Sequence, residues 1–241
     1  MLRILNCAMS FRDRLVASLK AAQAVLDVPG VMVAGSQVPN LLQPGADSTL
    51  VVSEDVDIVI PVSVHAQVKQ RLMGLRGYTP APDEPSVWVP DDPEKLEINF
   101  IGADPASRES ADSYVLNDDR LPLLVFGLLS FLRQGPDLVL TDLRVPLPRP
   151  AGLLLEKLLT ERSGLKGERD LLVALGLVLI SGAEDIDEFA SEIGRLRDDQ
   201  RRTVMANLAL LSLLRPVPGM PDPTAAREVL ASLIRRLEAL R

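Results

Sequence analysis

Two aspartates stand two positions apart in an otherwise apolar run, DVDIVIP, at residues 55 to 61. The run is typical of a buried strand, and in a strand residues i and i+2 point to the same face. Asp55 and Asp57 would then lie side by side and repel each other. In one interpretation, one aspartate caps a turn and the other is solvated at a strand edge. In the other, the fold brings positive charge to this face, because two buried like charges are costly unless a cation neutralises them.

Length and composition favour a globular protein. The chain has 241 residues, 47% of them hydrophobic, which suffices for one large domain or two small ones. The longest apolar run, LPLLVFGLLSFL at residues 121 to 132, is shorter than the roughly 18 to 20 residues that span a bilayer, and the N-terminus lacks a clear signal peptide. We therefore expect a cytoplasmic protein with no membrane partner.

The residue inventory restricts the kinds of metal site. Cys7 is the single cysteine and His65 the single histidine, so a cysteine cluster or a histidine-rich zinc site is excluded within the chain. Any metal must be held by oxygen. The formal charge of -7 argues against indiscriminate binding to nucleic acid, although a local basic patch would still bind a phosphate backbone.

Hydrophobic periodicity predicts strands early in the chain and helices later. In the first half we expect a helix at 10–27 capped by Ser10, strands at 30–36, 49–61 and 95–102, and a helix capped by Ser63 and running to about Arg76. The segment at 78–93 should form a loop with a short edge strand, SVWVP, around Trp88. After a polar segment at 103–120, we expect helices at 150–182 with a break at 163–168, then at 186–214 and 223–241. This order predicts an α+β fold, with a first domain at 1–145 and an all-helical second domain at 146–241.

Two further features stand beside the aspartate pair. Gly35 and Ser36 follow a short apolar strand, where glycine permits close approach and the serine hydroxyl and backbone amides would face an anion such as a triphosphate. Glu97 lies on the polar face of the strand at 95–102. Taken alone, the first is a common turn and the second an exposed edge position. Together with Asp55 and Asp57, they follow the order used when metal ions organise phosphoryl or nucleotidyl transfer, with Mg²⁺ as the missing positive charge.

These motifs resemble a known family. Gly35-Ser36, DVDIVI at 55–60 and LEINF at 96–100 look like the minimal nucleotidyltransferase fold of the DNA polymerase β type. LLLEKLLTER at 153–162 and ERDLLVAL at 168–175 are similar to the later motifs of AbiEii/MenT-like nucleotidyltransferases. The resemblance implies a mixed sheet flanked by helices, followed by a helical domain that completes the site.

The resemblance also implies roles for particular residues. Gly35 and Ser36 would lie at the nucleotide phosphates, and Asp55 and Asp57 would bind the metal, with Glu97 as the third ligand from the strand argument above. Lys157 and Arg162 would contact phosphate and Asp170 would orient them, so that Asp55, Asp57, Glu97, Lys157 and Asp170 form the catalytic set. For the basic and acidic residues of the later motifs, the competing interpretation is a solvated helix charge.

The implied activity is transfer of an NMP group from an NTP, with Mg²⁺ or Mn²⁺ as cofactor. The acceptor is left open between an RNA 3′ end such as that of tRNA, a protein and a small molecule, and a toxin-like member would have an antitoxin protein as partner. The alternative is a degenerate nucleotidyltransferase fold that binds nucleotide or protein without turnover. A nucleotide-sugar transferase with an Asp-x-Asp motif would not require the later Lys, Arg and Asp motifs.

Overall fold

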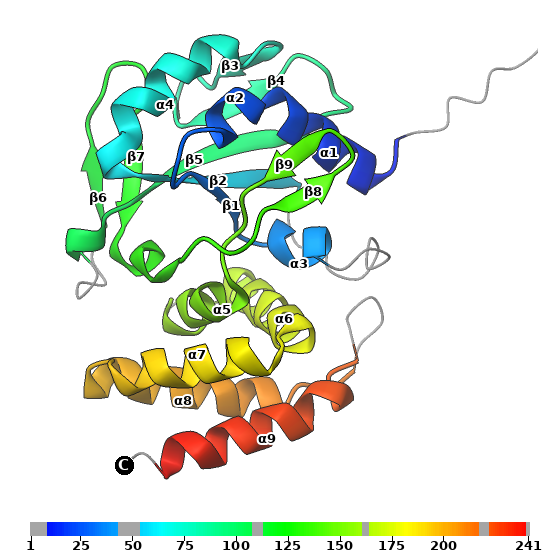
Figure 1. Ribbon diagram of the computed structural model, residues 1–241, viewed down its shortest axis with the longest axis vertical. Helices are drawn as coiled ribbons and strands as arrows, with labels where there is room; N and C mark the ends of the chain where they lie inside the picture. Colours follow the sequence, from blue (N-terminus) through cyan, green and yellow to red (C-terminus); the bar gives the residue numbers. More distant parts are fainter. Residues whose placement is uncertain (1–8, 43–53, 108–112, 161–163, 217–221, 240–241) are drawn as a thin grey trace, which may run out of the picture.

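The computed structural model describes residues 9–42, 54–107, 113–160, 164–216 and 222–239. In this part of the chain a seven-stranded mixed sheet carries helices on both faces, and further helices stack beyond it (Figure 1). The strands lie before residue 146 and the elements from Pro150 onward are helices. The expected α+β class, a mixed sheet followed by a helical part, is confirmed. The division into two domains at residue 145 stays a prediction.

The elements have the following bounds. The strands are β1 (Met32–Ala34), β2 (Asp55–Pro61), β3 (Tyr78–Pro80), β4 (Val87–Pro90), β5 (Glu97–Ala103), β6 (Ser113–Leu116), β7 (Leu123–Phe126), β8 (Leu138–Leu140) and β9 (Leu143–Val145). The helices are α1 (Phe11–Ala21), α2 (Gln23–Leu26), α3 (Gln37–Leu42), α4 (His65–Arg71), α5 (Pro150–Leu159), α6 (Gly164–Ile180), α7 (Ala183–Gly194), α8 (Asp198–Ser212) and α9 (Thr224–Glu238). Short 3₁₀ segments are η1 (Val62–Val64), η2 (Leu72–Gly74), η3 (Pro105–Ser107) and η4 (Gly127–Phe131).

The centre of the sheet is the parallel pair β2 and β5. Asp55 lies opposite Glu97 and Asp57 opposite Asn99 in their register, so these four side chains belong to one face. β1 pairs with the other edge of β2. The far edge of β5 is shared, since β4 pairs with its first half and β7 with its second half. The acidic face therefore lies at the middle of the sheet.

The two faces of the sheet have different covers. Val56, Ile58 and Phe100 are fully buried on the face opposite the aspartates, which α1, α2 and α4 cover (Figure 1). The acidic face turns toward α3, α5 and α6 (Figure 1). Within the described ranges, no helix combines the length and apolarity needed to span a bilayer.

Helix α5 lies at the centre of the helical part. It packs against η4, α6, α7 and α8, and all of its residues except Pro150 and Lys157 are buried. Pro150 suits the first position of a helix because it has no N–H to leave unpaired there. A helix enclosed in this way has no solvated face for charged side chains, so Glu156 and Lys157 must find partners inside the protein.

Two local predictions in the first half are wrong. The helix expected to be capped by Ser63 begins two residues later at His65, because η1 intervenes, and it ends at Arg71. The strand containing Trp88 is not at the edge: β4 pairs with both β3 and β5, and β3 is the edge strand. Pro90 is compatible with this interior position because it stands at the end of the strand.

Two predictions later in the chain also need correction. Strands β6 to β9 lie in segments that were not expected to form strands, and each has only three or four residues. Such short strands depend on pairing with neighbours more than on local pattern. The break expected at 163–168 ends earlier, since α6 begins at Gly164, and Asp170 lies in its second turn rather than at its start.

The close packing of α5 against η4 can be tested at Gly152. A Cβ there would lie 2.5 Å from the carbonyl oxygen of Phe131, which is backbone and cannot turn away. We expect Gly152→Ala to lower the free energy of unfolding by about 1 to 3 kcal/mol through overpacking. The matched control is Gly194→Ala, at the end of α7, where the added Cβ would meet nothing within 4 Å beyond its chain neighbours and its own helix backbone, and no loss is expected. Chemical denaturation of both variants measures the difference, and equal stabilities would contradict the close packing.

Candidate functional site

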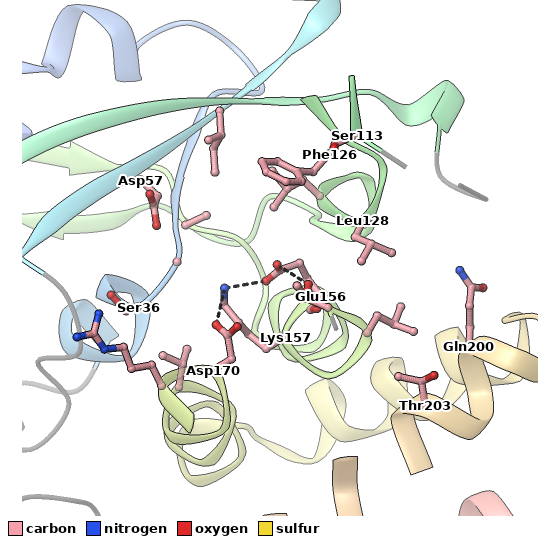
Figure 2. Close-up of a pocket in the computed structure, with 18 of the residues that line it drawn as sticks. Ser36, Asp57, Ser113, Phe126, Leu128, Glu156, Lys157, Asp170, Gln200 and Thr203 are labelled. Carbon is pink, nitrogen blue, oxygen red and sulfur yellow. Dashed lines mark hydrogen bonds and ion pairs between the residues drawn. The ribbon is translucent and has the colours of Figure 1, made fainter. Parts of the chain in front are cut away.

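A cleft of about 770 Å³ lies between the acidic face of the sheet and helices α5, α6 and α8 (Figure 2). Asp57 and Ser36 lie toward one end of it, and Gln200 and Thr203 of α8 toward the other (Figure 2). Five carboxylates and three cationic side chains are among its lining residues: Asp55, Asp57, Glu156, Asp170 and Asp199, with Lys157, Arg169 and Arg197. The excess of carboxylates favours a positively charged ligand.

Asn99 lies between the two aspartates. Its Nδ2 donates a hydrogen bond to Asp55 Oδ2 at 2.6 Å and to Asp57 Oδ1 at 3.4 Å. The amide nitrogen carries two hydrogens, so it can serve both acceptors. The other carboxylate oxygen of Asp55, Oδ1, is buried without a hydrogen-bond partner.

The aspartate pair is electrostatically strained. Burial, and after it the neighbouring Asp55 carboxylate, raises the pKa of Asp57 to about 6, against the opposing effects of Lys157 and Asn99. Both causes act on the charged form, since burial removes its hydration and Asp55 adds a like charge. The charged form of Asp57 is therefore destabilised on β2, and Lys157 and Asn99 offset only part of this effect.

The turn before α3 is built around Asp57. Gly35 has a φ of +73°, a conformation that favours glycine, and a Cβ at this position would collide with Asp57 Oδ2. Ser36 follows and lines the cleft. Gln37, which is buried, donates from Nε2 to the backbone oxygen of Asp55 at 3.1 Å. The turn and the aspartate strand are thus held against each other.

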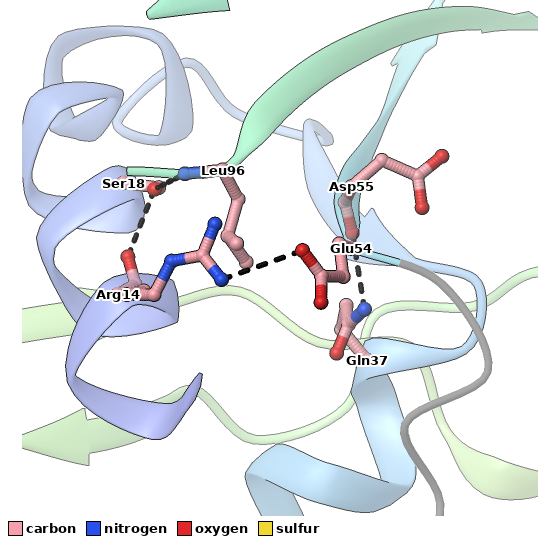
Figure 3. Close-up of polar contacts among 6 residues, drawn as sticks. All are labelled: Arg14, Ser18, Gln37, Glu54, Asp55 and Leu96. Carbon is pink, nitrogen blue, oxygen red and sulfur yellow. Dashed lines mark hydrogen bonds and ion pairs between the residues drawn. The ribbon is translucent and has the colours of Figure 1, made fainter. Parts of the chain in front are cut away.

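Helix α1 anchors the start of both acidic strands (Figure 3). Arg14 forms an ion pair with Glu54 at 3.4 Å, immediately before β2. The buried Ser18 hydroxyl accepts a hydrogen bond from the Leu96 N–H at 2.7 Å and donates to the Arg14 carbonyl at 2.9 Å, immediately before β5. These contacts fix how the two strand starts lie relative to α1.

The side chain that brings positive charge to the acidic face is Lys157. Its Nζ lies 3.1 Å from Glu156 Oε2 and 3.3 Å from Asp170 Oδ1 (Figure 2). The three side chains are 8%, 5% and 10% exposed, so the charges interact in a largely dry environment. The Lys157 charge also lowers the pKa of Asp57. Because five carboxylates and three cationic side chains line the cleft, the site keeps an excess of acidic groups.

The residues at the aspartate pair suit a hard divalent cation. Asp55 and Asp57 supply carboxylate oxygens, and Asp55 Oδ1 is buried and lacks a hydrogen-bond partner. Mg²⁺ is usually held in proteins by one or two carboxylates, with water and phosphate oxygens as its other ligands. Across the described residues, no group of three or more His, Cys, Asp or Glu side chains is arranged to hold a metal ion.

The structure brings together most of the residues that the sequence singled out. Those that line the cleft are Gly35, Ser36, Asp55, Asp57, Lys157 and Asp170. Glu97 shares the register and face of Asp55, but its side chain is exposed and it is not among the lining residues. The structure therefore does not bring Glu97 into the cleft with Asp55 and Asp57. Arg162 lies outside the described residues.

Several residues at the site were not expected from the sequence. Glu156 adjoins Lys157 and interrupts the same apolar run, so that interruption was a usable signal. Asn99 lies on the polar face of its strand beside Glu97, but only the register shows that it pairs with Asp57. The α8 residues Gln200 and Thr203 carried no local signal, because a helix face that borders a distant cleft looks like any solvated face.

Comparison with known proteins supports the fold. The protein is similar to the crystal structure of an antigenic nucleotidyltransferase-like protein from Paracoccidioides brasiliensis, with a TM-score of 0.51 and 17% sequence identity over 91% of this chain and 93% of that one. No family model matches the sequence, and no curated protein matches it. The chain therefore has a nucleotidyltransferase-like fold, recognised through structure rather than through sequence identity.

The raised pKa of Asp57 predicts that a neutral side chain at this position stabilises the folded protein, by an amount that depends on pH. Because the pKa of about 6 for Asp57 in the folded protein lies above the ordinary aspartate value of 3.8, folding becomes less favourable as pH rises through this interval, and the loss persists above it. At pH 7.5, Asp57→Asn should raise the free energy of unfolding by about 3 kcal/mol, since a pKa change of one corresponds to about 1.4 kcal/mol and the pKa of Asp57 is raised from 3.8 to about 6.

Thermal unfolding without divalent ions at pH 7.5 and pH 4.5 measures this effect. The gain should shrink at pH 4.5, where Asp57 of the original protein is largely protonated. Asp142→Asn is the control, because Lys20 lowers the pKa of that exposed carboxylate and its removal should give no gain. A variant no more stable than the original protein at pH 7.5 would contradict the strained pair.

Proposed function

We propose that the protein is a divalent-cation-dependent nucleotidyltransferase that moves an NMP group from an NTP to an acceptor hydroxyl. One observation carries this proposal: a single cleft holds the Asp55 and Asp57 carboxylates on one side and the Lys157–Asp170 ion pair on the other. The Gly35-Ser36 turn lies beside them. Phosphoryl chemistry needs charge stabilisation and positioning more than it needs covalent catalysis. The nucleotidyltransferase-like fold supports the same activity.

The reaction would proceed by in-line displacement. The acceptor oxygen attacks the α-phosphorus, the bond from that phosphorus to the bridging oxygen of the β-phosphate breaks, and pyrophosphate leaves with the electron pair. The proton of the acceptor hydroxyl passes to a carboxylate of the cleft or to water. In this arrangement, Lys157 would bind a phosphate oxygen as a compact cation, with Asp170 orienting it, and Ser36 would donate to a phosphate.

Asp55 and Asp57 would hold the cation. A bound Mg²⁺ or Mn²⁺ would neutralise phosphate charge and make the acceptor hydroxyl easier to deprotonate. The two aspartates fit this role because their charges are only partly offset within the protein. Gly35 would allow the phosphate-binding turn to approach them, since any side chain there would displace Asp57.

The other end of the cleft would hold the nucleoside. Phe126, Leu128 and Leu129 line it with apolar and aromatic surface, and Gln200 and Thr203 add polar groups. Ligand sites commonly combine an apolar wall with a few polar groups that set orientation. The cleft volume of about 770 Å³ is within the usual range for a ligand pocket.

The resemblance to AbiEii/MenT-like nucleotidyltransferases supports a finer proposal. The acceptor would then be the 3′ end of an RNA such as tRNA, and the protein would act as a cytoplasmic toxin restrained by an antitoxin protein. A protein side chain or a small molecule would serve as acceptor in a stand-alone modifying enzyme. A binding module without turnover would retain nucleotide affinity and transfer nothing.

The proposal predicts metal-dependent transfer that requires Asp57. We expect the protein, incubated with labelled NTPs, MgCl₂ or MnCl₂ and total RNA, to label an acceptor, and Asp57→Asn to lower the rate by about 100-fold or more. Gel electrophoresis of the labelled RNA and protein measures transfer, and Asp142→Asn is the control with an intact cleft. Nucleotide binding without transfer under all these conditions would favour the binding module.

A second prediction concerns the exposed acid that the sequence grouped with the pair. Because Glu97 is exposed and does not line the cleft, Glu97→Gln should retain transfer within about 3-fold, compared with the far larger loss expected for a metal ligand. The same labelled-NTP assay measures it. A loss as large as that of Asp57→Asn would restore Glu97 as a third ligand.

A further inference from the structure

Asn99 occupies the position beside the aspartate pair where a third carboxylate was expected. It lies opposite Asp57 in the register of β2 and β5, on the same face. Its Nδ2 contacts one oxygen of each aspartate, Asp55 Oδ2 and Asp57 Oδ1. Asn99 therefore bridges two carboxylates that would otherwise repel each other.

The bridge leaves the second oxygen of each aspartate directed elsewhere. Asp55 Oδ1 is buried without a hydrogen-bond partner, and Asp57 Oδ2 lies against the Gly35 turn. An amide donor that occupies one oxygen of a carboxylate restricts the rotation of that carboxylate about its last bond. The remaining oxygens are then held in place before any cation arrives.

The chemistry of the amide matters as much as its position. An aspartate at position 99 would add a third negative charge beside the carboxylates of Asp55 and Asp57. Asparagine is neutral and has two N–H groups for two acceptors, so it stabilises the pair without a metal. Hydrogen bonds to ligating carboxylates typically change metal affinity by about 10-fold to 100-fold.

We infer that Asn99 is a positioning residue that holds Asp55 and Asp57 ready for a divalent cation, so that the cation site has two carboxylates rather than three. The inference rests on the cation-binding part of the proposed function, and it concerns metal affinity rather than turnover.

The test measures Mn²⁺ binding by electron paramagnetic resonance, together with thermal unfolding without metal. Asn99→Leu keeps the approximate size of the side chain but removes both donors, and it should weaken Mn²⁺ binding by about 10-fold to 100-fold. Asn99→Asp also removes both donors and adds a third negative charge, so it should lower the unfolding midpoint of the metal-free protein. Asn117→Asp, at an exposed position, adds the same charge away from the cleft and should change neither.

The outcomes separate this inference from the proposed function. Unchanged Mn²⁺ affinity in a folded Asn99→Leu variant would overturn the inference, even if Asp57-dependent transfer is observed. If Asn99→Leu does not fold, the metal-free stability of Asn99→Asp decides, and an unfolding midpoint no lower than that of Asn117→Asp would overturn it. If the Asn99 variants show the expected changes but the original protein labels no acceptor, the inference is supported and the transferase proposal fails.

Discussion

The repulsion between Asp55 and Asp57 is the constraint on which the rest of the site depends. Both carboxylates lie on one face of a central strand, and burial adds to the cost of their charges. The protein answers with a hydrogen-bond donor from the next strand, Asn99, and a cation from the helical part, Lys157. Neither removes the excess negative charge, so the cleft stays suited to a cation and to the phosphates that a cation accompanies.

This electrostatic arrangement links the two parts of the chain. Lys157 comes from α5, a helix enclosed by its neighbours. Its ammonium group forms ion pairs with Glu156 and Asp170 and lies on the side of α5 that faces the sheet. A buried charge needs close partners, because the cost of leaving it unpaired is large. The packing of α5 is therefore also a condition for the charge balance on β2. Changes that shift α5 would act on the site through this lysine.

Different parts of the site were predictable to different degrees. The aspartate strand and the Gly35 turn were visible because alternation and glycine act within a few residues. Glu97 was grouped with the aspartates on the same logic, yet its side chain is exposed at the start of β5, and Asn99 takes the adjoining position. The polar face of β5 carries both residues, so alternation alone did not distinguish them. The short strands from β6 to β9 were missed because three or four residues carry too little alternation to mark a strand, even though β6 pairs with β7 and β8 with β9.

The sequence by itself determined which residues had to find partners: two like charges on an apolar strand, and a lysine within a run of leucines. It also determined the α+β order of the elements, since periodicity is a local property. Only the tertiary structure decided who the partners are. Register placed Asn99 beside Asp57, and helix packing brought Lys157 toward the same face, because both depend on contacts between segments far apart in the chain.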